Sequence, residues 1–140
     1  MNFKQFSIAT LVGAVVLFLL GFLFYAVLLE GFFQGNVGSA TGVMKDDASM
    51  NMPLLFVGNL ATAALITYIF LQWAGISTFS TGLKAGLIIG FLMTLGNNLV
   101  LYSTSNITNM TGALVDVVVY AVIVGVAGGM IGLILGKVKK

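Results

Sequence analysis

Four long apolar runs, separated by short polar segments, constrain the fold of this chain more than any other feature. They cover about residues 6–29, 53–75, 83–103 and 113–136, and each is close to the roughly 20 residues that an α-helix needs to cross about 30 Å of hydrocarbon. Of the 140 residues, 59% are hydrophobic and only 7% are charged, too few to cover the surface of a soluble fold. The sequence therefore predicts an all-α polytopic membrane protein with four transmembrane helices, forming a single domain over residues 1–140.

The polar segments predict the orientation of these helices. Residues 30–52 form the longest connection, rich in Gly, Ser, Asn and Asp, and they are the only segment long enough to form a lid. Lysine gathers on the cytoplasmic side of membrane proteins. Lys45 stands alone on one side of the predicted spans, whereas the other side holds Lys4, Lys84, Lys137, Lys139 and Lys140. This bias predicts both termini in the cytoplasm and residues 30–52 outside.

Two asparagines in the last connection match a modification pattern. Asn106 and Asn109 are each followed two residues later by threonine, as in N-glycosylation acceptors. Asparagine is also a preferred turn and helix N-cap residue, because its side-chain oxygen accepts a free backbone N–H. We interpret this pair as turn and N-cap residues ahead of the fourth helix.

The composition argues against most enzyme classes. The chain has no Cys and no His, which removes thiol nucleophiles, imidazole acid/base chemistry and nearly all zinc or haem ligation. Asp116 is the only carboxylate inside a predicted helix, and Glu30 lies at a rim, so no carboxylate pair shares acid/base work. The net charge of +2 is too small for a nucleic-acid surface. We therefore expect no catalytic residue, no metal and no cofactor.

Glycine recurs every four residues in the inner halves of the last two predicted helices. Small residues at this spacing let helix backbones approach closely in lipid. The two rows predict tight pairing of the third and fourth helices on the cytoplasmic side, within one chain or across a dimer. The helix-packing residues are Gly82, Gly86, Gly90, Gly128, Gly132 and Gly136.

Polar side chains gather at another depth. At 1.5 Å per residue, Tyr25, Asn59, Asn98 and Asp116 fall roughly 6 to 12 Å below the outer end of their helices. A polar group at that depth is costly unless it faces the bundle interior, a partner or water. With the neighbours of Asn98 and Asp116 included, the candidate ligand-binding residues are Asp116, Asn98, Asn97, Asn59, Tyr120 and Tyr25.

Two interpretations of this polar layer remain open. It lines an outward-facing cavity in which Asp116 recognises a cation or proton, as in an oligomeric binding or transport module. Alternatively, its members are interhelical clamps worth about 0.6 to 2 kcal/mol each, and Asp116 is stabilised by the dipole of the fourth helix. The second interpretation suits a structural or accessory subunit of a larger membrane complex with no ligand of its own.

Several segments carry a resemblance to a known family: FSIATLVGAVVLFLLGFLFYAVLL, SATGVMK, YIFLQWAGISTFSTGLKAGLIIGFLM and NITNMTGALVDVVV. In these segments the chain resembles a group of small uncharacterised bacterial four-helix membrane proteins, a domain of unknown function. The similarity spans most of the chain and consists of hydrophobic patterning and packing motifs. It implies four helices in a bacterial inner membrane, and it assigns no site residues.

Overall fold

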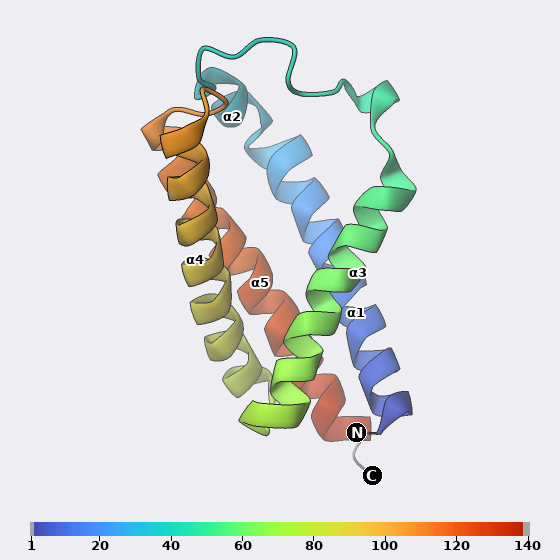
Figure 1. The fold of residues 1–140 in the computed structure, drawn as a ribbon. Helices are drawn as coiled ribbons and strands as arrows, with labels where there is room; N and C mark the ends of the chain where they lie inside the picture. Colours follow the sequence, from blue (N-terminus) through green and yellow to red (C-terminus); the bar gives the residue numbers. More distant parts are fainter. Residues whose placement is uncertain (1, 139–140) are drawn as a thin grey trace.

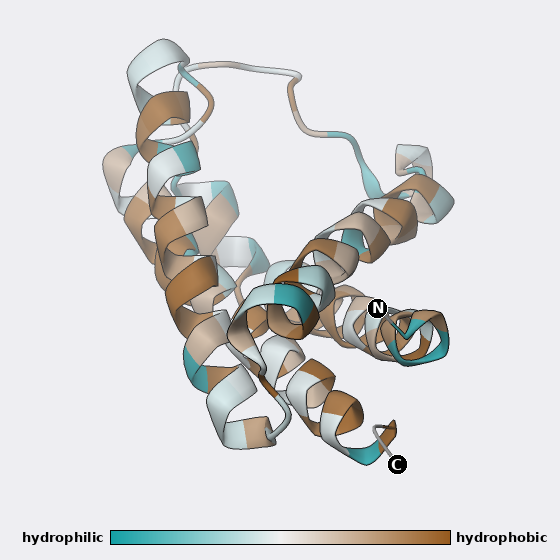
Figure 2. Cartoon of the chain, turned by 60° about the horizontal axis from the view of Figure 1, so that its bottom comes forward, coloured by the Kyte–Doolittle hydropathy of each residue, from teal (hydrophilic) through white to brown (hydrophobic). Residues whose placement is uncertain are grey.

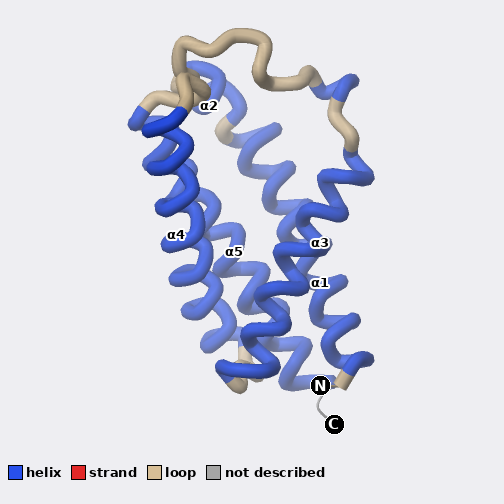
Figure 3. The backbone as a smooth tube through the Cα atoms, viewed as in Figure 1, coloured by secondary structure: helices blue, strands red, loops and turns tan. Residues whose placement is uncertain are grey.

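The computed structural model describes residues 2–138, so Met1, Lys139 and Lys140 lie outside the described part. The first two helical spans are α1 (Phe3–Gly21) with the π-helical extension η1 (Phe22–Leu28), and α3 (Met52–Ile69) with the π-helical extension η3 (Phe70–Ala74). The last two are α4 (Phe79–Thr104) and α5 (Met110–Val138). Two short elements, α2 (Glu30–Gly35) and the 3-10 turn η2 (Asp47–Ser49), lie between α1 and α3. Figure 3 shows all of them along the backbone.

The all-helical, four-helix prediction is confirmed for the described residues. The segments Phe3–Leu28, Met52–Ala74, Phe79–Thr104 and Met110–Val138 are each long and apolar enough to cross a membrane. The described residues form no strand, and their only β-type pairing is an isolated bridge between Val37 and Thr108.

The four spans begin earlier than the apolar runs because polar residues cap them. Asn2, Asn51, Thr78 and Asn109 each accept, through a side-chain oxygen, a backbone N–H two or three residues ahead. Asn109 receives the N–H of Gly112 at 2.8 Å, so its interpretation as an N-cap is confirmed. The apolar pattern misses these first turns because their residues are partly polar.

α5 is the central helix of the bundle. It packs along α4 on one side and along α1 on the other, while α3 packs on α1 and hardly touches α4. In Figure 1, α3 and α4 diverge toward the end that carries α2, and both chain termini lie at the opposite end. We call these the loop end and the terminal end.

The core lies between α1, α3 and α5, and the outer surface is apolar. Leu17, Ile66, Phe70, Ile123 and Ile131 are almost completely buried. Figure 2 shows hydrophobic residues along all four spans. A soluble bundle would carry a polar stripe on its outward faces. The exposed large apolar residues include Leu11, Leu19, Leu54, Trp73, Ile88 and Leu92.

The connection at residues 30–52, predicted as one loop, is partly helical and partly fixed. Its first residues form α2, in which Gln34 donates a hydrogen bond to Glu30 at 3.0 Å. The next stretch is held against the α4–α5 turn, because the N–H groups of Gly38 and Ala40 bond to the carbonyls of Ile107 and Asn106. Residues 41–51 are exposed and cross to the start of α3 (Figure 1). Only this second part resembles a free loop.

Candidate functional site

The glycine row of α4 lies directly against α5. A Cβ atom placed on Gly86 would lie 2.5 Å from the carbonyl oxygen of Val124 and 3.0 Å from Cα of Gly125. At Gly90 it would lie 3.0 Å from Cα of Ala121, and Gly82 faces the carbonyl of Gly128. The two backbones therefore touch, and the contact forms within one chain.

The glycine row of α5 meets two different segments. Gly128 faces Gly82 and Gly86 on α4. Gly132 and Gly136 instead face the carbonyls of Thr78 and Ser77, in the connection between η3 and α4. Both rows are thus covered by the chain itself, so a contact between two copies has to use another surface.

Asp116 of α5 is the centre of a hydrogen-bonded cluster near the loop end. The Tyr25 hydroxyl donates to Oδ1 of Asp116 at 2.5 Å, and Nδ2 of Asn98 donates to Oδ2 at 2.7 Å. Nδ2 of Asn98 also donates to the carbonyl of Ala113 at 3.0 Å. Asn98 is buried, and Tyr25 and Asp116 are half-buried. One carboxyl group thereby joins η1, α4 and α5.

The helix geometry explains why these groups meet. The buried residues of α4 recur every four positions, in the order Gly82, Gly86, Gly90, Thr94 and Asn98. Asn98 is therefore the last member of the row of α4 residues that packs along α5. Tyr25 lies in η1, where the Leu29 N–H reaches back to the Phe24 carbonyl in a wide π-type turn that changes side-chain directions.

Two further members of the predicted layer lie outside this hydrogen-bonded cluster. Tyr120, one turn along α5 from Asp116, is half-buried against the core, and its hydroxyl lies beside Thr62 of α3. Asn59 of α3 is half-buried, and its Nδ2 donates to the carbonyl of Leu55 in its own helix at 2.9 Å. Neither side chain makes a hydrogen bond to Asp116.

Asn97 is the member that the structure separates from the cluster. It precedes Asn98, but its side chain points about 100° away around the helix. It is exposed and makes no hydrogen bond within the described residues. Of the six predicted ligand-binding residues, hydrogen bonds therefore join only Tyr25, Asn98 and Asp116.

The cluster leaves the charge of Asp116 uncompensated. Its two hydrogen-bonding partners are both neutral, and the membrane-length spans carry their lysines, Lys4, Lys84 and Lys137, in turns at the terminal end. A carboxylate has about four lone-pair positions, of which the two hydrogen bonds use two. Within the described part of the chain, no three Asp or Glu residues lie together as a metal site would need.

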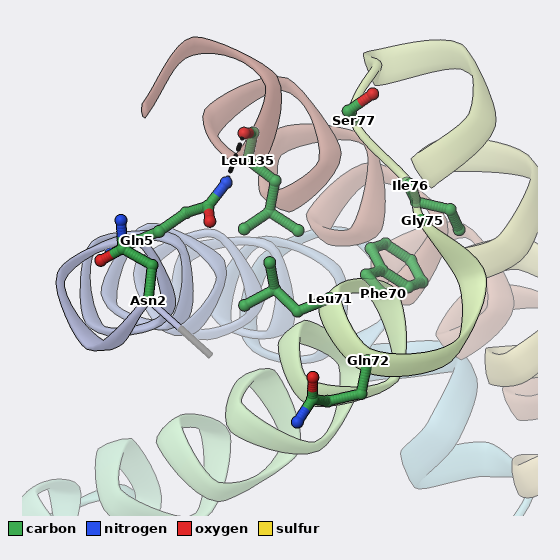
Figure 4. Close-up of a pocket in the computed structure, with 9 residues that line it drawn as sticks. All are labelled: Asn2, Gln5, Phe70, Leu71, Gln72, Gly75, Ile76, Ser77 and Leu135. Atoms are coloured by element: carbon green, nitrogen blue, oxygen red, sulfur yellow. Dashed lines mark hydrogen bonds between the residues drawn. The ribbon is translucent and has the colours of Figure 1, made fainter. Parts of the chain in front are cut away.

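Sequence reasoning missed a second polar feature, at the terminal end. Gln5 is buried, and its Nε2 donates to the carbonyl of Leu135 on α5 at 2.7 Å (Figure 4). Beside it is a recess of about 300 Å³ whose polar lining includes Asn2, Gln72 and Ser77. The available signal was a glutamine within the first turn of an apolar helix. None of the described residues that line this recess is charged, which makes it the weaker candidate site.

A third polar contact, also missed, fixes the loop end. Nδ2 of Asn109 donates to Oδ1 of Asn36 at 3.1 Å, and the Asn109 N–H donates to the Asn36 carbonyl at 3.2 Å. These residues lie 73 positions apart. No local pattern could have paired them.

Comparison with protein-family models, with curated proteins and with solved structures gives no match. The resemblance to a small four-helix membrane family therefore stays a prediction. The function has to be inferred from the geometry around Asp116.

Proposed function

We propose that the chain is a multi-pass integral membrane protein of a bacterial inner membrane, with its terminal end in the cytoplasm. Four apolar helices of spanning length and an outer surface rich in large apolar side chains support this location. Lys4, Lys84 and Lys137 belong to turns at the terminal end, and the positive-inside rule makes this a support for a cytoplasmic terminal end. The family resemblance is the basis for choosing a bacterial membrane.

Within that membrane the protein acts as a binding module for a small cationic species, a proton or a monovalent cation, at Asp116. The observation that carries this proposal is a half-buried carboxyl group whose hydrogen-bond partners are both neutral. An ionised carboxylate at membrane depth is costly without a counter-charge. Since these partners supply none, a bound proton or cation is the species that would neutralise it.

The partners of Asp116 are suited to such binding. A tyrosine hydroxyl both donates and accepts, so Tyr25 can bond to Oδ1 when Asp116 is ionised and when it carries a proton. The amide group of Asn98 is fixed as a donor, because it bonds to both Asp116 and Ala113. Proton uptake at Oδ1 then needs no rearrangement of the helices, and a cation would use the remaining lone pairs.

Infrared spectroscopy of the protein in lipid films tests this proposal. The chain has only four carboxyl side chains, so the spectrum of this group is simple. The other carboxyl groups also respond when the pH is lowered, so the signal of Asp116 is the part of the carboxyl-band change that differs between the wild type and Asp116→Asn. We expect this part to appear when the pH is lowered or when choline is exchanged for Na⁺, and we expect the variant Asp116→Asn to lose it. A double variant of the exposed Asp46 and Asp47 to Asn is the matched control and should keep it. An unchanged wild-type spectrum, or the same response in Asp116→Asn, would contradict a binding site.

A second function is favoured by the same contacts. Asp116 joins three helical segments, which is what a clamp in a structural or accessory subunit of a larger complex would do. An amide at position 116 can still accept from Asn98 and donate to Tyr25. If the clamp is the whole role, wild type and Asp116→Asn should respond identically to cations and have similar stability, and the protein should purify with a stoichiometric partner.

A further inference from the structure

The exposed amide of Asn97 lies at membrane depth with no partner on its own chain. Asn97 is seven residues from Thr104, where α4 ends, which corresponds to about 10 Å along the helix. It makes no hydrogen bond within the described residues and is exposed. An unpaired carboxamide in hydrocarbon is costly, and a partner from outside this chain would stabilise it.

The residues around Asn97 form one continuous unpartnered face of α4. Met93 is 50% exposed and Val100 is 64% exposed, one turn to either side of Asn97. Thr104 is also exposed, and a Cβ atom on Gly96 would meet nothing within 4 Å. This spacing is that of a helix–helix seam. We call these five residues the Asn97 face.

A second copy of the chain suits this face for two reasons. A carboxamide both donates and accepts, so it is its own complement, and a two-fold axis along the membrane normal places the same residue opposite at the same depth. The face carries no charge that would repel a copy, and Gly96 permits close approach of two backbones. The glycine rows are already covered within the chain and do not compete.

We propose that the protein forms a parallel dimer through the Asn97 face, with the Asn97 amide hydrogen-bonded to Asn97 of the partner subunit. The neighbouring Asn98 takes no part, because it is buried against α5. The dimer rests on the proposed membrane location and goes beyond the cation site at Asp116. Either the dimer or the cation site can fail while the other stands.

Cysteine crosslinking in native membranes tests the interface directly, since the chain has no cysteine of its own. The variant Val100→Cys lies on the Asn97 face, leaves the Asn97 amide in place and should form a disulfide-linked dimer on mild oxidation. Tyr102→Cys is the matched control, because Tyr102 is 40% exposed at nearly the same depth and points about 200° away around α4. Equal crosslinking of both variants, or monomers from Val100→Cys, would overturn the proposal.

Single-molecule counting in liposomes at increasing dilution provides the second measurement. Asn97→Leu should lower the dimerisation constant by about three- to thirty-fold, the range expected for one interhelical polar contact. Asn97→Gln keeps the amide and should retain most of the association. Circular dichroism should be unchanged in both variants, because Asn97 makes no contact that holds the monomer. A wild-type monomer, or an Asn97→Leu variant that associates like wild type, would show that a lipid or another protein covers this face instead.

Discussion

The contact between α4 and α5 is built in two ways along its length. In the terminal half, Gly82 and Gly86 bring one backbone against the other. In the loop half, the row ends in Asn98, whose side chain bonds to Asp116 and Ala113. At one end the two helices are thus joined by direct backbone contact at glycines, and at the other end they are joined by hydrogen bonds between side chains.

This difference separates the part of the contact that specifies the fold from the part available for chemistry. The terminal half has no room for an added atom, so it fixes the distance and angle of the helices. The loop half has room for two polar side chains and a third from η1. Changes in the terminal half should therefore cost more stability than changes in the loop half, and only the latter should alter binding.

The largest effect should come from a side chain added in the terminal half. In Gly86→Leu, even the first added carbon would lie 2.5 Å from the Val124 carbonyl oxygen, so α4 and α5 must separate. We expect the free energy of unfolding to fall by about 3 kcal/mol, measured by steric trapping in bicelles. Gly58→Leu on α3 is the control, since nothing lies within 4 Å of a Cβ there. Comparable losses in both variants would mean that the glycine contact does not fix the pair.

The next effect concerns the centre of the cluster. Asp116→Leu removes both hydrogen bonds and leaves the Tyr25 hydroxyl without its acceptor, so we expect a loss of about 1 to 2 kcal/mol in the same unfolding assay. Asp116→Asn should lose less than half as much, because its amide still bonds to both neighbours. If Asp116→Leu is as stable as wild type, the cluster does not clamp the helices, and its role is binding alone.

A smaller effect distinguishes two adjacent asparagines. Asn98→Ala removes the donor to Asp116 and should lower the free energy of unfolding of the monomer by about 1 kcal/mol. Asn97→Ala should leave the stability of the monomer unchanged, because Asn97 makes no hydrogen bond within the described chain. Unfolding in detergent, at a dilution where dimers dissociate, compares them. Equal losses would contradict the assignment of Asn98 to the interior and Asn97 to the surface.

The sequence predicts the depth of each group better than its direction. Counting along the apolar runs places Tyr25, Asn98 and Asp116 in one layer, and the glycine spacing places α4 against α5. Direction was readable in one case, because continuing the row from Gly82 in steps of four leads to Asn98. It was not readable for Tyr25, because the π-helical turn of η1 changes the relation between residue number and direction.

Contacts between distant loops were beyond sequence reasoning altogether. The bonds from Asn109 to Asn36 depend on where the ends of α1 and α5 come to lie, which the helix packing decides. Asn59 was assigned to the layer by depth, yet its amide bonds to its own helix. From one sequence, the lengths of the apolar runs predict how deep each side chain lies along its helix. The sequence predicts which helices pack together only where small residues recur at a regular spacing.

The smallest effect should come from the exposed loop, where the carboxyl group of Asp46 lies in solvent and can be compared with the half-buried carboxyl group of Asp116. Hydrogen bonds from Ser49, including its N–H at 2.9 Å from Oδ1, hold the pKa of Asp46 below its usual value. A lowered pKa means that the turn is stabilised above the ordinary pKa and that this stabilisation is lost as the pH falls through the lowered one. Carbon NMR of the Asp46 carboxyl should show the low pKa, and Ser49→Ala should shift it upward.

The free energy of global unfolding should not change in Ser49→Ala, because the Asp46 carboxyl is exposed to solvent. A measurable global loss in Ser49→Ala would mean that this exposed turn contributes to the stability of the whole fold, contrary to the prediction.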